Sequence, residues 1–169
     1  MRSLLDFSQC PLPPTKHQKV GVAKLIRDPY VFLTDEPGAG KSKQVIDAAQ
    51  IMFERGIIDR VIVVCPASVK PVWFDPDLGQ LRAHCWETVG NHIIHYHRKT
   101  KDWAIGPQSK SLEWVITNYE YIRTGFRSRS RYTPERLTKL LALCGPKTFL
   151  VLDESSAIKT NRAFQTRAC

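Results

Sequence analysis

Residues 35–42 read DEPGAGKS, and this stretch decides how the rest of the chain is interpreted. It follows an apolar run, residues 30–34, and precedes a run whose apolar residues recur at helical spacing. A strand, a glycine-rich turn and a helix N-terminus together bind phosphate, because backbone N–H groups and the helix dipole favour an anion there. Lys41 can reach the β- and γ-phosphates, and the Ser42 hydroxyl can ligate Mg²⁺. The general pattern G-x-x-x-x-G-K-[ST] fails at its first position, where Asp35 stands.

The composition is that of one globular domain. The chain has 169 residues, of which 43% are hydrophobic and 24% charged, enough for a real core. No apolar stretch approaches the roughly 18 residues of a membrane span, so no membrane partner is expected. The five cysteines are scattered and form no C-x-x-C pair, which favours a reducing compartment over a disulfide framework or zinc knuckle. The net charge of +9 suggests a polyanionic partner.

Strands and helices are expected to alternate along the chain. A proline-punctuated arm, residues 1–15, comes first. The patterns predict strands over 30–34, 60–65, 114–118 and 148–152, and helices over 16–27, from the loop to about 55, over 69–81 and over 134–143; residues 86–89 could form a further strand. This alternation favours an α/β fold with a mainly parallel central sheet.

Two acidic residues, Asp153 and Glu154, follow the last predicted strand. The carboxyl ends of parallel strands lie at one edge of a sheet, where ligands bind. Asp153 is placed to hold Mg²⁺, directly or through water, and Glu154 to orient and deprotonate an attacking water. The simpler interpretation is a polar strand end that caps the next helix. The glycine-rich loop upstream favours the first interpretation.

These residues resemble motifs of the SNF2-type branch of superfamily 2 helicases. Residues 35–42 look like motif I, D-E-M-G-L-G-K-T, in which the acidic opening is usual. Residues 153–160, DESSAIKT, resemble motif II, D-E-A-H-x-I-K-N. Residues 63–73, VVCPASVKPVW, resemble motif Ia, and residues 116–120, ITNYE, resemble the I-T-x-Y-E element. His17-Gln18 with Gly21 match the Q-motif region, so the resemblance spans residues 17–160.

The resemblance implies a three-layer RecA-like P-loop lobe over residues 16–169, the first of two helicase lobes, with ATP and Mg²⁺ as cofactors. It implies catalytic roles for Lys41 and Glu154, and Mg²⁺ ligation by Ser42 and Asp153. The residues expected to contact the nucleotide are Gln18, which reads the adenine edge, and Pro37, Gly38, Ala39, Gly40, Lys41 and Ser42.

The chain departs from the family pattern at several places. Pro37 and Ala39 replace Met and Leu, and Ser155-Ser156 replaces Ala-His, so the histidine that couples ATP state to a neighbouring motif is missing. The serine pair resembles phage and bacterial members, which implies a cytoplasmic location in a bacterium or phage-infected cell, or a nuclear one in a eukaryote. The chain is expected to be truncated before the motif III strand. The second RecA-like lobe, with its arginine fingers, would then be supplied in cis or in trans, and the lone lobe would not complete turnover.

A basic stretch of the sequence predicts DNA binding. Arg123, Arg127, Arg129 and Arg131 follow the ITNYE element, where relatives contact the phosphate backbone. Loop arginines suit salt-sensitive, sequence-independent binding, here of duplex DNA. Lys70 is a further candidate, whereas Trp73 fits core packing better. The alternative for the arginines is a solvated basic loop.

Two other functions stay open from the sequence. One is a non-catalytic nucleic-acid-binding or regulatory module that retains the P-loop fold. The other is an unrelated small P-loop kinase or NTPase, against which Ile158-Lys159 and Tyr119-Glu120 count. His92, His95 and His97 with Cys85 could suggest a metal, but no second ligand pair with zinc spacing accompanies them.

Overall fold

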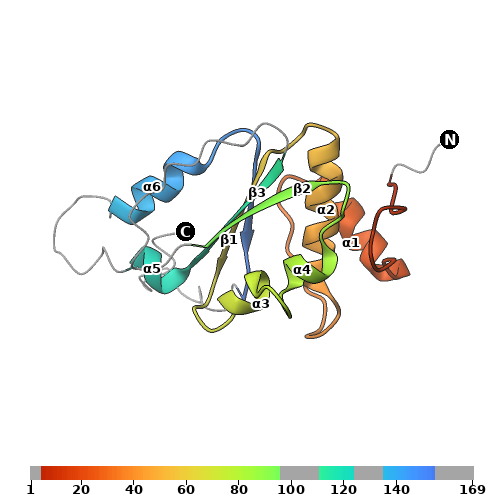
Figure 1. Cartoon of the computed structure of the whole chain (residues 1–169), viewed down its shortest axis with the longest axis horizontal. Coiled ribbons are helices and arrows are strands. Elements are labelled where there is room, and N and C mark those ends of the chain that lie inside the picture. Colours follow the sequence, from red (N-terminus) through yellow and green to blue (C-terminus); the bar gives the residue numbers. More distant parts are fainter. Residues whose placement is uncertain (1–4, 96–110, 124–134, 155–169) are drawn as a thin grey trace.

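The computed structural model of the chain describes residues 5–95, 111–123 and 135–154 (Figure 1). The described elements, in chain order, are α1 (Lys16–Arg27), α2 (Lys41–Glu54), β1 (Arg60–Cys65), α3 (Lys70–Phe74), α4 (Gln80–His84), β2 (Gly90–His95), β3 (Ser111–Asn118), α5 (Tyr119–Arg123), α6 (Glu135–Leu143) and β4 (Thr148–Leu152).

The four described strands form one sheet in the order β2-β3-β1-β4, and every pairing in it is parallel. β1 pairs with β3 on one side and β4 on the other, with Cys65 opposite Asn118 and Val64 opposite Leu152. The β-branched run of β1 suits this central place, because a parallel strand covered on both faces needs apolar side chains in both directions. The predicted α/β fold with a parallel sheet is confirmed.

Helices cover both faces of the sheet, so the fold has three layers (Figure 1). Alternate residues of β1 point to opposite faces. Val61, Val63 and Cys65 belong to a core that includes buried residues of α1, α2 and α4. Ile62 and Val64 belong to a second core, which α5 and α6 complete.

Residues 30–34 do not form the predicted strand. Tyr30 and Phe32 are 93% and 71% exposed, while Val31 and Leu33 pack against the core. The side-chain pattern is therefore that of a strand. A strand also needs a neighbour to accept and donate its backbone hydrogen bonds, and within the described ranges no strand pairs with this segment. The prediction from the local pattern was wrong for that reason.

Two other elements differ from the predictions. The helix expected over 69–81 is divided into α3 and α4, because the Asp75 carboxylate accepts hydrogen bonds from the backbone N–H groups of Asp77 (3.0 Å) and Leu78 (2.9 Å) and so turns the chain. Residues 86–89, considered as a possible strand, do not form one; the strand in this region is β2, which begins at Gly90.

None of the helices in the described ranges combines sufficient length with sufficient apolar character to cross a membrane.

A buried ion pair links three elements at the amino end of the sheet. Arg60 and Glu113 are partners in the β1–β3 register and form a salt bridge, with side chains 11% and 1% exposed. The Arg60 guanidinium also donates to the Leu143 carbonyl of α6, at 2.7 Å. We predict that Glu113→Ala lowers the free energy of unfolding by about 3–5 kcal/mol, because it removes the carboxylate of a largely buried ion pair. Urea denaturation measures this change.

The matched control is Asp28→Ala, which removes the partner of Arg27 in a pair whose arginine side chain is 75% exposed. Exposed pairs contribute little to stability. Equal effects of the two variants would contradict the structural role assigned to Glu113.

Candidate functional site

The glycine-rich loop adopts backbone angles that require glycine. Gly38 and Gly40 have φ values of +83° and +79°, in the left-handed region that side chains with a Cβ disfavour. Gly40 is the N-cap of α2, which begins at Lys41 and runs for 14 residues. The amino end of this helix therefore opens onto the loop, where its dipole and N–H groups favour an anion.

The Lys41 side chain lies inside the turn of this loop. Its Nζ donates hydrogen bonds to the backbone carbonyls of Asp35, at 2.8 Å, and Glu36, at 3.1 Å. Both acceptors belong to the loop itself, so the ammonium is held where the loop residues converge. Phosphate oxygens bound there would compete with these two carbonyls for the same donor.

Asp35 has a structural partner that explains its presence in the loop. The Gln44 amide, on α2, donates from Nε2 to Oδ2 of Asp35 at 2.7 Å. Gln44 is 1% exposed, so the bond is shielded from water on that side. The carboxylate thus connects the start of the loop to α2. The sequence alone relates Asp35 only to the acidic opening of the motif that residues 35–42 resemble.

Gln18 contacts the loop through its side-chain amide. Oε1 accepts from the Thr15 backbone N–H at 3.0 Å, as part of a capping box at the start of α1. Nε2 donates to the Ala39 carbonyl at 3.2 Å, and the His17 ring lies at the same distance from that carbonyl. Gln18 thereby fixes α1 against the loop, and its recognition of adenine stays a prediction.

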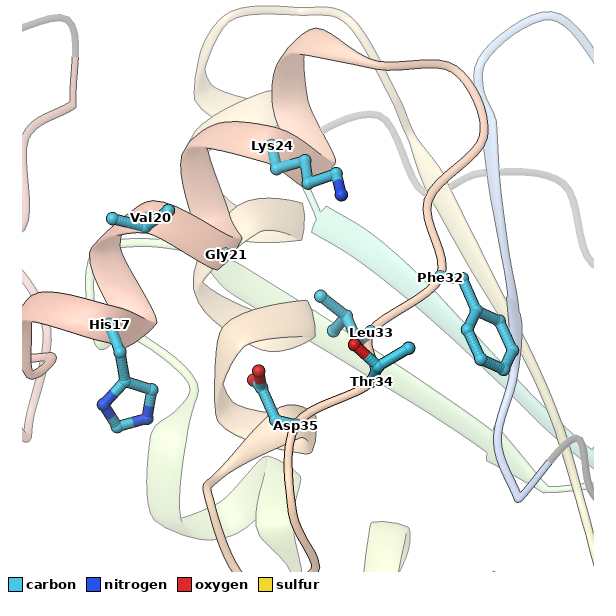
Figure 2. Close-up of a pocket in the computed structure, with 8 residues that line it drawn as sticks. All are labelled: His17, Val20, Gly21, Lys24, Phe32, Leu33, Thr34 and Asp35. Atoms are coloured by element: carbon cyan, nitrogen blue, oxygen red, sulfur yellow. The ribbon is translucent and has the colours of Figure 1, made fainter.

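A cavity of about 300 Å³ lies between α1 and the segment that leads into the loop (Figure 2). The residues that line it are His17, Val20, Gly21, Lys24, Phe32, Leu33, Thr34 and Asp35. Of the predicted nucleotide-binding residues, none lines this cavity. It is therefore beside the loop and does not coincide with the predicted phosphate site.

Asp153 is held at every polar atom. Its backbone N–H donates to the Val64 carbonyl at 2.9 Å, and its carbonyl accepts from the Tyr119 hydroxyl at 3.0 Å. In the carboxylate, Oδ2 accepts from the Trp73 indole N–H at 2.7 Å, and Oδ1 accepts from the Glu154 backbone N–H at 3.0 Å. Glu154 is exposed and has a φ of +50°, which is uncommon for a residue with a Cβ.

The carboxyl ends of β1 and β3, the two central strands, are also connected. The Glu120 carboxylate accepts from the Ala67 backbone N–H, at 3.2 Å, and from the Asn118 side chain, at 2.9 Å. Figure 1 shows the loop before α2 at the same end of the molecule as α3 and the carboxyl ends of β1 and β4. This is the edge at which ligands of parallel α/β sheets bind.

The residues at this edge fit a magnesium–nucleotide complex. The Ser42 hydroxyl and the Asp153 carboxylate are the oxygen ligands that Mg²⁺ prefers, and Mg²⁺ usually takes one or two protein ligands and completes its shell with phosphate oxygens and water. Two left-handed glycines, a helix N-terminus and a lysine are suited to the phosphates.

The residues predicted to contact DNA are only partly described. Lys70, the first residue of α3, is 7% exposed, and burial lowers the pKa of its ammonium. A phosphate contact would therefore require the side chain to reorient, and this role stays a prediction. The side chain of Arg123 and all of Arg127, Arg129 and Arg131 lie outside the described residues.

The cysteine and histidine candidates for a metal site are only partly described. Cys85 is half-buried, and burial raises the pKa of its thiol to about 12. In the described ranges, no group of three or more metal-ligating side chains comes together. His92 lies in β2, whereas the His95 side chain and His97 are outside those ranges.

Comparison with known proteins places these features in a family. A sequence model described as SNF2-related domain matches residues 17–169. The human DNA excision repair protein ERCC-6-like is 23% identical over 154 residues, which are 86% of this chain and 11% of that protein. This chain thus spans about a tenth of the length of that relative.

A solved structure, the Sulfolobus solfataricus SWI2/SNF2 ATPase core in complex with dsDNA, has the same fold. It matches with a TM-score of 0.61 and 14% identity, over 98% of this chain and 36% of that chain. The RecA-like lobe expected from the sequence is thereby confirmed as the fold of an SNF2 ATPase core.

The Asp35–Gln44 bond leads to a prediction on stability. We expect Asp35→Ala to lower the free energy of unfolding by about 1–3 kcal/mol, because the buried Gln44 amide would lose its acceptor. Urea denaturation measures the loss. The control is Glu36→Ala, since Glu36 is exposed and its contact with Lys41 is made by the backbone carbonyl. If Asp35→Ala were as mild as the control, the bond would not anchor the loop.

Proposed function

The chain belongs to the SNF2-related domain family, and on that premise we propose that it is the ATP-binding lobe of a DNA-dependent ATPase of the helicase or translocase type. Its similarity to an SNF2 ATPase core supports an ATPase of this general kind. The observation that carries the proposal is the position of Lys41, held within a turn of two left-handed glycines at the amino end of α2.

Each residue of the site then has a role in ATP hydrolysis. The loop from Pro37 to Gly40 and the first amides of α2 bind the phosphates, and Lys41 neutralises part of their charge. Ser42 and Asp153 would hold Mg²⁺, which when bound neutralises charge that develops on the phosphates. Glu154 orients the attacking water and accepts its proton. Gln18, already in contact with the loop, recognises the adenine.

Full turnover requires a second lobe. Phosphoryl transfer depends on positioning and charge neutralisation, and an arginine finger contributes about 10³–10⁵ in rate. We propose that a second RecA-like lobe supplies this arginine in cis or in trans. The described lobe would bind ATP·Mg²⁺ but hydrolyse it slowly by itself.

The polyanionic partner is proposed to be duplex DNA, contacted through its phosphate backbone. The net charge of +9 supports a polyanion, and the similar SNF2 ATPase core was solved in complex with dsDNA. Arg123, Arg127, Arg129, Arg131 and Lys70 are the proposed contacts. Such an enzyme would work where the DNA is, in the bacterial or phage-infected cytoplasm or in a nucleus.

We predict that Lys41→Ala abolishes nucleotide binding, because it removes the ammonium that the loop directs at the phosphates. Isothermal titration with ATP and Mg²⁺ measures the affinity. The control is Lys147→Ala, which removes an exposed lysine just before the amino end of β4, away from the proposed site. Unchanged ATP affinity in Lys41→Ala would refute the assignment.

ATPase assays with duplex DNA separate this proposal from a non-catalytic module. Hydrolysis stimulated by DNA once a second lobe is supplied supports the two-lobed enzyme. Nucleotide and DNA binding with no hydrolysis, whether or not the second lobe is present, would favour a regulatory module instead.

The basic stretch yields a quantitative prediction on salt. Changing Arg127, Arg129 and Arg131 together to Ala should reduce the slope of log K for duplex DNA against log salt by roughly 2.7, since each phosphate contact contributes about 0.9. Fluorescence anisotropy at several salt concentrations measures the slope. Arg82→Ala, at an exposed position of α4, is the control. An unchanged slope in the triple variant would indicate that the stretch is a solvated loop that does not contact DNA phosphates.

A further inference from the structure

Trp73 makes a polar contact that a packing role does not require. The residue lies in α3 and is 1% exposed, so its ring is part of the core. Its indole N–H donates to Oδ2 of Asp153, 80 residues further along the chain, at 2.7 Å. This distance is at the short end of the N–H···O range, as expected when the acceptor is a carboxylate.

The indole bond fixes the direction of the carboxylate. The backbone of Asp153 is already set by Val64 and Tyr119, but those bonds leave the side-chain torsions undetermined. Within the described part of the chain, the donors to the carboxylate are the indole N–H of Trp73 and the adjacent Glu154 amide. A carboxylate has about four lone-pair positions, so both oxygens keep capacity for a cation while the group is held in one orientation.

We propose that Trp73 is a positioning residue for the magnesium-binding carboxylate of Asp153, and that it makes the metal affinity of the nucleotide site depend on where α3 lies. The proposal rests on the function proposed above. An outer hydrogen bond to a metal ligand typically contributes 10–100-fold in metal affinity. Removal of the indole N–H should therefore weaken Mg²⁺ binding without weakening the contact between the loop and the nucleotide.

The surroundings of α3 explain how such a dependence arises. α3 follows the carboxyl end of β1, and the turn before it is attached to α5 through the Ala67–Glu120 bond. The segment that follows β1 thus contributes Trp73, which donates to the Asp153 carboxylate, and the segment that follows β3 contributes Tyr119, which donates to the Asp153 carbonyl. These two strands and β4 are consecutive in the sheet, so a shift of the segment between β1 and α4 moves the donor relative to the carboxylate.

The test is a titration of Mg²⁺ against the full chain with ADP, in the wild type, Trp73→Phe, Asp153→Ala and the double variant. We expect Trp73→Phe to raise the Mg²⁺ concentration for half-maximal enhancement of ADP binding by roughly 10-fold or more. The affinity for ADP in EDTA should not change. In the Asp153→Ala background, Trp73→Phe should have no further effect on the Mg²⁺ dependence.

Trp114→Phe is the matched control. Trp114 is also fully buried, and its indole N–H donates to the Asn91 side chain of β2 at 2.8 Å, away from Asp153. This variant loses the same group from an equally buried ring, so it should lose stability while keeping the wild-type requirement for Mg²⁺. A shift of the Mg²⁺ requirement in both variants would mean that general loosening of the fold is responsible.

A spectroscopic measurement does not depend on nucleotide. In the ¹⁵N-labelled chain, the indole N–H resonance that disappears in Trp73→Phe should shift in Asp153→Ala, whereas the Trp114 resonance should stay in place. If Trp73→Phe does not fold, benzothienylalanine at position 73 replaces the N–H by sulfur in a ring of the same size, and the titration is done with that variant.

The outcomes distinguish this inference from the function on which it rests. A wild-type chain that binds no nucleotide would contradict the proposed function and this inference with it. A wild-type chain that binds ADP in a Mg²⁺-dependent way, with the same Mg²⁺ requirement in Trp73→Phe, would overturn the inference and leave the proposed function intact.

Discussion

The central position of β1 is the constraint on which the rest of the structure depends. The strand is paired along both edges, and the side chains from Val61 to Cys65 are buried, alternately against one core and the other. A shift of β1 by one residue relative to its neighbours would turn each of its side chains from one core to the other. The register that results brings Asn118, the last residue of β3, and Asp153, the residue after β4, to the edge where β1 ends.

The same strand register determines which residues contact Asp153. Asp153 is one residue past β4 and bonds through its backbone to Val64, the residue before the end of β1. Trp73 and Tyr119 come from the segments that follow β1 and β3, so contacts from two neighbouring strands and their connections set the position of Asp153. The Asp153 carboxylate is thereby held in one orientation, which is what the metal-ligand role proposed for it would require.

The sequence predicted the features that local physics controls. The β-branched run of β1 predicted a strand, and the loop glycines predicted a turn next to a helix N-terminus; the structure has both. Residues 30–34 were predicted wrongly because pairing is a property of the neighbouring strand and not of the segment. The Trp73–Asp153 bond was not foreseen, since nothing local to either residue indicates a partner 80 positions away.

The acidic residue at the start of the loop shows how the general phosphate-binding pattern can change without loss of its geometry. The pattern has glycine at position 35 as well as at position 40. Within residues 35–42, positions 38 and 40 are the ones in the left-handed region. Among the described residues the sole non-glycine with a positive φ is Glu154. The backbone at Asp35 therefore does not require glycine. Its carboxylate bonds to Gln44 of α2, and its carbonyl accepts from Lys41, so the substitution adds an anchor to the loop while the glycines that shape the turn are kept.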